Sequence, residues 1–258
     1  MYLRKPARHL ISLGSAGGSA SYLIELMDIE TKLEILDQIY EIYDRFCARL
    51  SVACERNCAI CCTGNVTLTT LEGYRMIEDM LQKDKADLPG RLDGAAETGR
   101  FQPKITTNQL ADLCRQGKKV PEEDNGQAAT PCFFLEKDEC PLYTHRPFGC
   151  RCLMSRRKCD DTGYADMDDF VLSVNTVFLQ TIEHIDSDGF SGNLIDVLLF
   201  LRSKTHRQDY RSGRPDVTGT RLIPNRPMTI LFVPPEHQNR MAPILQAVQA
   251  IQVPVKPS

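Results

Sequence analysis

Apolar residues recur every three or four positions between residues 22 and 50, which is the spacing of one face of an α-helix. One row starts at Leu26 and ends at Leu50, and a second row runs from Ile35 to Phe46. Two rows make the apolar face wider than a coiled-coil seam, so we expect this helix to be buried on more than one side. Homodimerisation through residues 22–50 is the alternative use of the same face.

The same periodicity predicts further helices along the chain. They run from about Leu71, after an extended segment at 65–69, from Thr107 to Gln116, from about Met167 to Ile185, from Asn193 to Arg202 and from Glu236 to Ile251. Two short apolar runs, 131–135 and 140–143, flank Glu-Lys-Asp-Glu and predict a small β-hairpin, and 229–233 is strand-like. The pattern therefore predicts a mainly α protein with a small β-hairpin.

The polar stretches suggest how the chain is divided. Residues 1–21, rich in Gly and Ser, predict a flexible N-terminal tail, and residues 22–203 predict a helical domain. Within that domain, residues 83–104 are charged and rich in Gly and Pro, so we expect a surface insertion with little fixed structure. Residues 204–258, basic and turn-rich at first, predict a C-terminal strand–helix extension.

Charge and hydropathy narrow the classes of partner. The formal net charge is −3 and the pI is about 6.0, whereas a general nucleic-acid-binding module usually carries a basic excess, so no nucleic-acid partner is expected. No apolar run approaches the roughly 18 residues that span a bilayer, so no membrane partner is expected. The sequence predicts a cytoplasmic protein, in which thiols stay reduced.

Cysteines supply the most specific chemistry. Residues 54–62 read Cys-Glu-Arg-Asn-Cys-Ala-Ile-Cys-Cys, and a second group lies at Cys132, Cys140, Cys150 and Cys152. Thiolates this close repel one another unless a soft cation neutralises them, so the pattern predicts a metal site. A disulfide framework is less favoured, because the chain has an odd eleven cysteines and adjacent Cys61 and Cys62 are awkward to pair. The predicted core is thus irregular, cysteine-rich and stapled by metal.

Three segments together resemble the YkgJ-type cysteine-cluster family of zinc- or iron-chelating domains. They are the CERNCAICC run, the PCFFL segment and the CPLYTHRPFGCR segment, in the order that the family pattern has. The resemblance covers roughly residues 50–155, and the rest of the chain lies outside it. It implies that the metal ligands are Cys54, Cys58, Cys61, Cys62, Cys132, Cys140 and Cys150. We add Cys152 because it lies two positions after Cys150.

Charged residues and the remaining cysteines near this motif are expected to have other roles than metal binding. Arg146 and Arg151 lie inside the motif and could offset the thiolate charge. His145 is a lone histidine in a turn, which is more often a surface residue than a ligand. The remaining cysteines are not expected to bind metal: Cys47 and Cys114 lie on helix faces, and Cys159 lies in a charged surface turn.

The sequence leaves two functional classes open. In the first, an all-cysteine site holds zinc or iron and has a structural or metal-handling role. The iron could be part of a 4Fe-4S cluster. In the second, the centre belongs to an iron–sulfur enzyme, either redox-active or transferring methyl groups from S-adenosylmethionine to protein lysines. The spacing of Cys54, Cys58 and Cys61 matches radical S-adenosylmethionine enzymes, and flagellin lysine N-methylases are similar in their cysteine motif. No catalytic residue and no protein partner is assigned.

Overall fold

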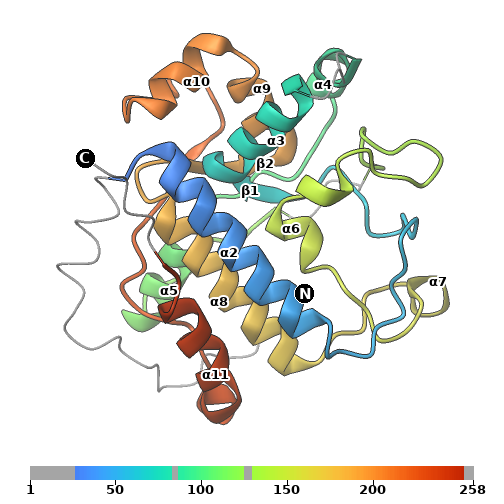
Figure 1. Cartoon of the computed structure of the whole chain (residues 1–258), viewed down its shortest axis with the longest axis vertical. Coiled ribbons are helices and arrows are strands. Elements are labelled where there is room, and N and C mark those ends of the chain that lie inside the picture. Colours follow the sequence, from blue (N-terminus) through green and yellow to red (C-terminus); the bar gives the residue numbers. More distant parts are fainter. Residues whose placement is uncertain (1–26, 83–86, 125–129, 253–258) are drawn as a thin grey trace.

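Two long helices lie side by side through the middle of the molecule (Figure 1). The computed structural model describes residues 27–82, 87–124 and 130–252. Helix α2 (Ile29–Cys47) begins at Asp28, whose side chain accepts a hydrogen bond from the Thr31 amide, and residues 22–26 of the predicted helix lie outside the described part. Helix α8 (Asp169–Ile185) and helix α11 (Gln238–Gln249) pack on α2. The expected burial of α2 on more than one side is confirmed; its use in a homodimer stays a prediction.

A small antiparallel sheet lies beside these helices. Its order is β1 (Thr67–Thr69), β2 (Phe190–Asn193) and β3 (Ile223–Pro224), with Thr67 opposite Asn193. The strand-like run 229–233 lies outside this sheet. The side chain of Gln180 holds it instead, donating to the Ile230 carbonyl and accepting from the Phe232 amide, each at 2.8 Å. A mainly α fold with a small β component is confirmed.

The helices that flank the sheet begin at side chains that cap them. Helix α3 (Thr70–Gln82) has a capping box, in which the Glu72 amide donates to Thr69 Oγ1 and the Thr69 amide donates to Glu72 Oε2. Helix α9 (Leu194–Leu201) starts at Asn193, which accepts from the Ile195 amide. Helix α5 (Thr107–Arg115) starts at Thr106 in the same way. These predicted helices are confirmed.

Two helices lie where the sequence did not predict them. Helix α4 (Asp87–Ala96) lies within the predicted insertion, and helix α10 (Lys204–Arg211) lies within the turn-rich stretch. The expectation was wrong because a few buried contacts suffice: Leu92 and Ala95 of α4 are buried, and α4 packs against α9. Residues 83–86 of the insertion lie outside the described part.

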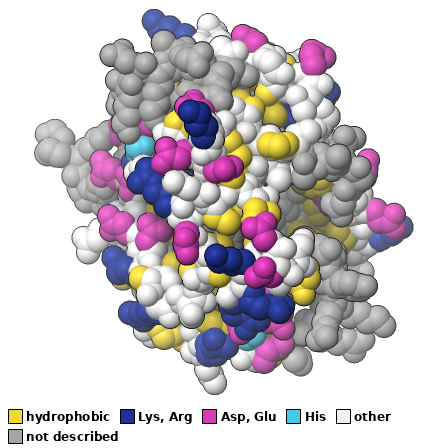
Figure 2. Space-filling model, turned by 90° about the vertical axis from the view of Figure 1, so that its right-hand side faces the viewer, with side chains coloured by type: hydrophobic (Ala, Val, Ile, Leu, Met, Phe, Trp, Pro, Cys, Tyr) yellow, Lys and Arg dark blue, Asp and Glu magenta, His cyan; other side chains and the backbone are white. Residues whose placement is uncertain are grey.

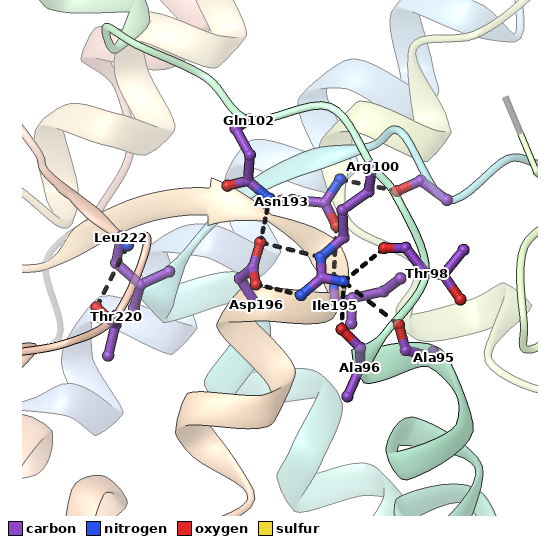
Figure 3. A network of polar contacts seen from close by, with 11 residues as sticks. Ala95, Ala96, Thr98, Arg100, Gln102, Asn193, Ile195, Asp196, Thr220 and Leu222 are labelled. Carbon is purple, nitrogen blue, oxygen red and sulfur yellow. Dashed lines mark hydrogen bonds and ion pairs between the residues drawn. The ribbon is translucent and has the colours of Figure 1, made fainter. Parts of the chain in front are cut away.

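A buried ion pair fixes the end of α4 to the start of α9 (Figure 3). Arg100 donates to both carboxylate oxygens of Asp196, at 2.6 and 3.2 Å, and its remaining nitrogen donates to the carbonyls of Ala95, Ala96 and Thr98. Gln102 donates to the same carboxylate at 2.7 Å. This network ties the predicted insertion to the core.

Asp186 joins four separate parts of the fold. Its fully buried carboxylate accepts hydrogen bonds from the Thr70 hydroxyl at 2.8 Å and the Leu71 amide at 3.0 Å, at the start of α3. It also accepts from the Tyr210 hydroxyl of α10 at 2.6 Å and from the Asn225 amide group at 3.1 Å. The end of α8, where Asp186 lies, is thereby joined to α3, to α10 and to the segment after β3.

The C-terminal region shares the core of the helical part. Tyr210, Leu222, Leu231 and Met241 belong to the same cluster of buried apolar side chains as α2 and α8. Within the described residues, no helix is both long and apolar enough to cross a membrane. On the face shown in Figure 2, acidic and basic side chains are interspersed, with apolar side chains visible between them.

Candidate metal centre

The first cysteine group lies on an irregular loop between α2 and β1. Two successive turns shape it: the Cys58 amide donates to the Glu55 carbonyl at 3.2 Å, and the Cys62 amide donates to the Ala59 carbonyl at 2.9 Å. Asn57 has a φ of 74°, a left-handed conformation that Asn tolerates well. Cys58 is exposed and the other loop cysteines are half-buried. The loop therefore presents its thiols at different depths.

Backbone pairing brings the second group to this loop. The Cys132 amide donates to the Cys62 carbonyl and the Gly64 amide donates to the Thr130 carbonyl, both at 2.9 Å. Between Cys132 and Cys140 the chain reverses in a tight turn closed by an antiparallel bridge from Glu136 to Glu139. The predicted hairpin, with a cysteine beyond each end of the turn, is thus present in minimal form.

Cys150 is positioned by a short helix, α6 (Phe148–Arg151), which follows the 3₁₀ turn η1 (Tyr143–His145). The Phe148 amide donates to Glu72 Oε1 at 2.6 Å, which fixes the start of α6 to α3. Gly149 lies directly against β1, since a Cβ there would come within 2.8 Å of the Thr67 carbonyl oxygen. Only glycine permits this approach, and the approach places Cys150 beside the loop.

Seven of the eight predicted ligands line one cavity of about 210 Å³, which we call the inner cavity. They are Cys54, Cys58, Cys61, Cys62, Cys132, Cys140 and Cys150. The eighth, Cys152, is not in its wall; it caps the end of α6, and its thiol contacts the Gly149 carbonyl oxygen at 3.6 Å. The segments that the resemblance identified therefore meet in space.

The three cysteines that were not expected to bind metal differ in their surroundings. Cys114 lies near the end of α5, which packs on α8, as expected for a helix-face residue. Cys47 is on the helix face of α2 as expected, but it also lines the inner cavity. Cys159, expected in a surface turn, is half-buried and lines a larger, open cavity of about 610 Å³ together with Cys54, Cys58 and Cys62. We call this the outer cavity; the residues on either side of Cys159 are charged and exposed, as expected, and the thiol itself is half-buried.

The thiols differ in their readiness to ionise. Burial raises the pKa of Cys150 far above the usual range and that of Cys152 to about 12. A hydrogen bond between adjacent Cys61 and Cys62 raises the pKa of Cys61 and lowers that of Cys62. The Cys62 thiol therefore ionises more readily than the Cys61 thiol. Gathering further thiolates here requires positive charge.

Arg146 is placed to supply part of that charge. Its guanidinium lies 4.0 Å from the centre of the Tyr143 ring, and the side chain lines the inner cavity. Its positive charge acts to lower the pKa of Cys61 and of Cys150. Other, larger effects raise both pKa values. Its Nε is buried and has no hydrogen-bond partner among the described residues. A buried donor without a partner beside a group of thiols fits an anionic centre.

The other polar residues of this region serve structural contacts. Arg151 donates to the carbonyls of Arg146 and Thr144, at 3.0 and 2.7 Å, and lies over the Tyr40 ring. His145 faces α3, with Nδ1 3.1 Å from Asp79 Oδ2. Arg151 also lines the inner cavity, but its printed hydrogen bonds go to backbone carbonyls, whereas the buried Nε of Arg146 has none among the described residues.

The thiols line the same cavity but are not arranged around a single point as metal ligands would be. None of the eleven cysteines is in a disulfide. Across residues 27–82, 87–124 and 130–252, no three His, Cys, Asp or Glu side chains form a group that could hold a metal ion as they stand. Metal binding would thus draw the loop and hairpin thiols together, and a wall of sulfur donors fits soft cations such as zinc or iron.

Comparison of the chain with family models, with curated protein sequences and with solved structures found no match. The resemblance to the YkgJ-type family therefore rests on the three motif segments.

Proposed function

We propose that this protein binds zinc or an iron centre through cysteine thiolates, in a structural or metal-handling role. The observation that supports the proposal is the convergence of thiols from three segments, 54–62, 132–140 and 150, on the inner cavity. Thiols that are distant in sequence but close in the fold can act as ligands of one metal, which then joins the segments that carry them. The buried Nε of Arg146 and its charge add the compensation that several thiolates need.

The direct test is the metal content of the protein purified anaerobically under reducing conditions. We expect close to one equivalent or more of zinc or iron per chain, measured by elemental analysis. A content below about a tenth of an equivalent, with no uptake of added Zn²⁺ or Fe²⁺ by the reduced protein, would refute the proposal.

Replacing Arg146 should weaken metal binding without removing a ligand. We expect Arg146→Gln to raise the dissociation constant for Zn²⁺ about tenfold, because the variant lacks one of the positive charges beside the thiols. Competition with a chromophoric chelator measures this change. Arg115→Gln, at the exposed end of α5, is the matched control and should leave the affinity unchanged. Equal affinities for the two variants would mean that Arg146 serves only its contact with Tyr143.

The second candidate is an iron–sulfur enzyme, redox-active or transferring methyl groups from S-adenosylmethionine to protein lysines. The exposure of Cys58 favours it, because an exposed ligand leaves one side of a cluster within reach of a small molecule. Visible absorption near about 400 nm that bleaches with dithionite would favour this candidate, whereas a colourless zinc protein would favour the structural role.

A further inference from the structure

The outer cavity opens onto the predicted metal centre. Its volume of about 610 Å³ lies in the range that organic ligands occupy in proteins, whereas the inner cavity, at about 210 Å³, is smaller than that range. Three of the predicted ligands, Cys54, Cys58 and Cys62, line both cavities, and the other four in the inner wall line the inner cavity alone. A molecule in the outer cavity therefore meets the centre at these three shared thiols.

The shared thiols lie at different depths. Cys58 is exposed, and Cys54 and Cys62 are half-buried. The Ser155 amide donates a hydrogen bond of 3.1 Å to the Cys54 sulfur. The backbone of Cys62 is paired at 2.9 Å with that of Cys132, which lines the inner cavity alone. A metal ion can thus pass from exposed Cys58 to the thiols of the inner cavity without leaving a surface lined by sulfur.

A second segment of the outer wall is anchored to the same loop. The Ala53 amide donates to the Ser155 carbonyl at 2.8 Å, and the Asp166 amide donates to the buried Ser155 Oγ at 2.9 Å. Between these anchors, residues 157–160 line the outer cavity and lead into the short helix α7 (Cys159–Thr162). The two segments that form this wall are therefore held together by hydrogen bonds.

The outer wall carries charges of both signs that do not neutralise one another. Its cations are Arg56, Arg157 and Lys158, and its acids are Glu55, Asp138 and Asp160. Among the described residues, the one ion pair made by these six side chains joins Arg157 to Asp166, which lies outside the outer cavity. The other five charged groups remain available to a ligand. A small molecule with both carboxylate and ammonium groups is complementary to such a wall.

We infer that the outer cavity binds a small zwitterionic thiol, such as a short cysteine-containing peptide, which exchanges metal with the shared thiols. The inference rests on the proposed metal-binding function. Arg56 and Lys158 bind the carboxylates of this carrier, and its sulfur replaces Cys58 on the metal. The carrier is a thiol because carboxylate donors alone compete poorly with thiolates for a soft cation.

The exchange is balanced without an oxidant or a reductant. For each metal–sulfur bond that breaks at a cysteine of the chain, one forms to the carrier, and the proton of the carrier thiol passes to the departing cysteine thiolate. Delivery of metal to the chain is the same exchange in reverse. The outer cavity would thus give the predicted metal centre a route for loading and unloading.

The test is the rate at which Zn²⁺ passes from the loaded full chain to a chromophoric chelator, without oxygen and at low ionic strength. Glutathione is the zwitterionic probe, and 2-mercaptoethanol, an uncharged thiol, is compared with it at equal thiolate concentration. In the wild type we expect glutathione to accelerate the transfer about tenfold more than 2-mercaptoethanol does. In Arg56→Glu with Lys158→Glu, this ratio should fall to about one, because the reversed charges repel the carboxylates.

The ratio is compared because both positions lie beside predicted ligands, so that the substitutions can also change metal affinity. Lys118→Glu with Lys119→Glu is the matched control, since it changes the net charge equally at exposed positions outside both cavities, and it should keep the wild-type ratio. Arg56→Gln with Lys158→Gln should give an intermediate ratio, and this neutral pair provides the result if the charge reversal impairs folding.

The outcomes separate this inference from the proposed function. A wild type that binds no Zn²⁺ refutes both. A wild type that does not distinguish glutathione from 2-mercaptoethanol overturns the carrier site, while the protein remains a metal-binding protein. The carrier site is also overturned if the substitutions at Arg56 and Lys158 leave the ratio unchanged, or if the control pair lowers it equally.

Discussion

Cys150→Ser should abolish the stabilisation that metal gives the protein. Metal bound to Cys150 would join α6 to the loop and the hairpin, and we expect this link to contribute about 3–5 kcal/mol to the free energy of unfolding. For a chain of this size the melting temperature of the wild type should therefore fall by roughly 10 °C on chelation. In Cys150→Ser the melting temperature should be the same with and without chelator.

The comparison within each variant is what makes this measurement specific. Cys150 is half-buried and packs against the core, so a serine there can destabilise the metal-free protein as well, and only the metal-dependent difference counts. Cys114→Ser, which leaves every predicted ligand in place, should retain the full shift. A Cys150→Ser variant that still melts about 10 °C lower on chelation would show that Cys150 is not a ligand.

Asp186→Asn should destabilise the protein whether or not metal is bound. Its carboxylate accepts hydrogen bonds from Thr70, Leu71, Tyr210 and Asn225, and an amide of the same shape turns one acceptor into a donor facing these donors. We expect a loss of about 2–4 kcal/mol, measured by urea denaturation of the metal-free protein.

The matched control is Asp209→Asn on α10, next to Tyr210 and half-exposed, which should change the free energy of unfolding by less than about 0.5 kcal/mol. Metal affinity should be the same in both variants, since Asp186 lies outside both cavities. A loss in Asp186→Asn as small as that of the control would mean that water replaces the lost acceptor, so that the four parts of the fold do not depend on this carboxylate.

Periodicity and capping signals predicted most of the fold. Helices such as α2 and α8 show their apolar faces in the sequence, and Thr69 with Glu72 marks the start of α3. Strands β2 and β3 were missed because four and two residues are too few to show alternation. Helix α4 was missed because Pro89, Gly90 and Gly94 dilute its pattern, although proline is tolerated in a first turn.

The candidate site was predicted in composition but not in arrangement. The motif segments named seven of the eight thiols that line the inner cavity, and Cys47 of α2 is the eighth. Cys152, added because it lies two positions after Cys150, is not in the wall of the inner cavity, because it follows α6 as its C-cap and its thiol contacts the Gly149 carbonyl oxygen. Cys159 was missed because the backbone pairing that carries it to Cys54, through Ser155, joins residues about a hundred positions apart.

The turn between Cys132 and Cys140 offers a way to engineer this protein. Lys137 and Asp138, at its tip, both have positive φ values, 49° and 67°, a conformation that side chains other than those of glycine and asparagine disfavour. Tight hairpin turns with this backbone prefer Asn followed by Gly. The natural pair therefore adopts this backbone at a cost in strain that Asn-Gly would reduce. Lys137→Asn with Asp138→Gly would pre-organise the thiols of Cys132 and Cys140. The affinity for metal could then be tuned from a surface turn without altering any predicted ligand.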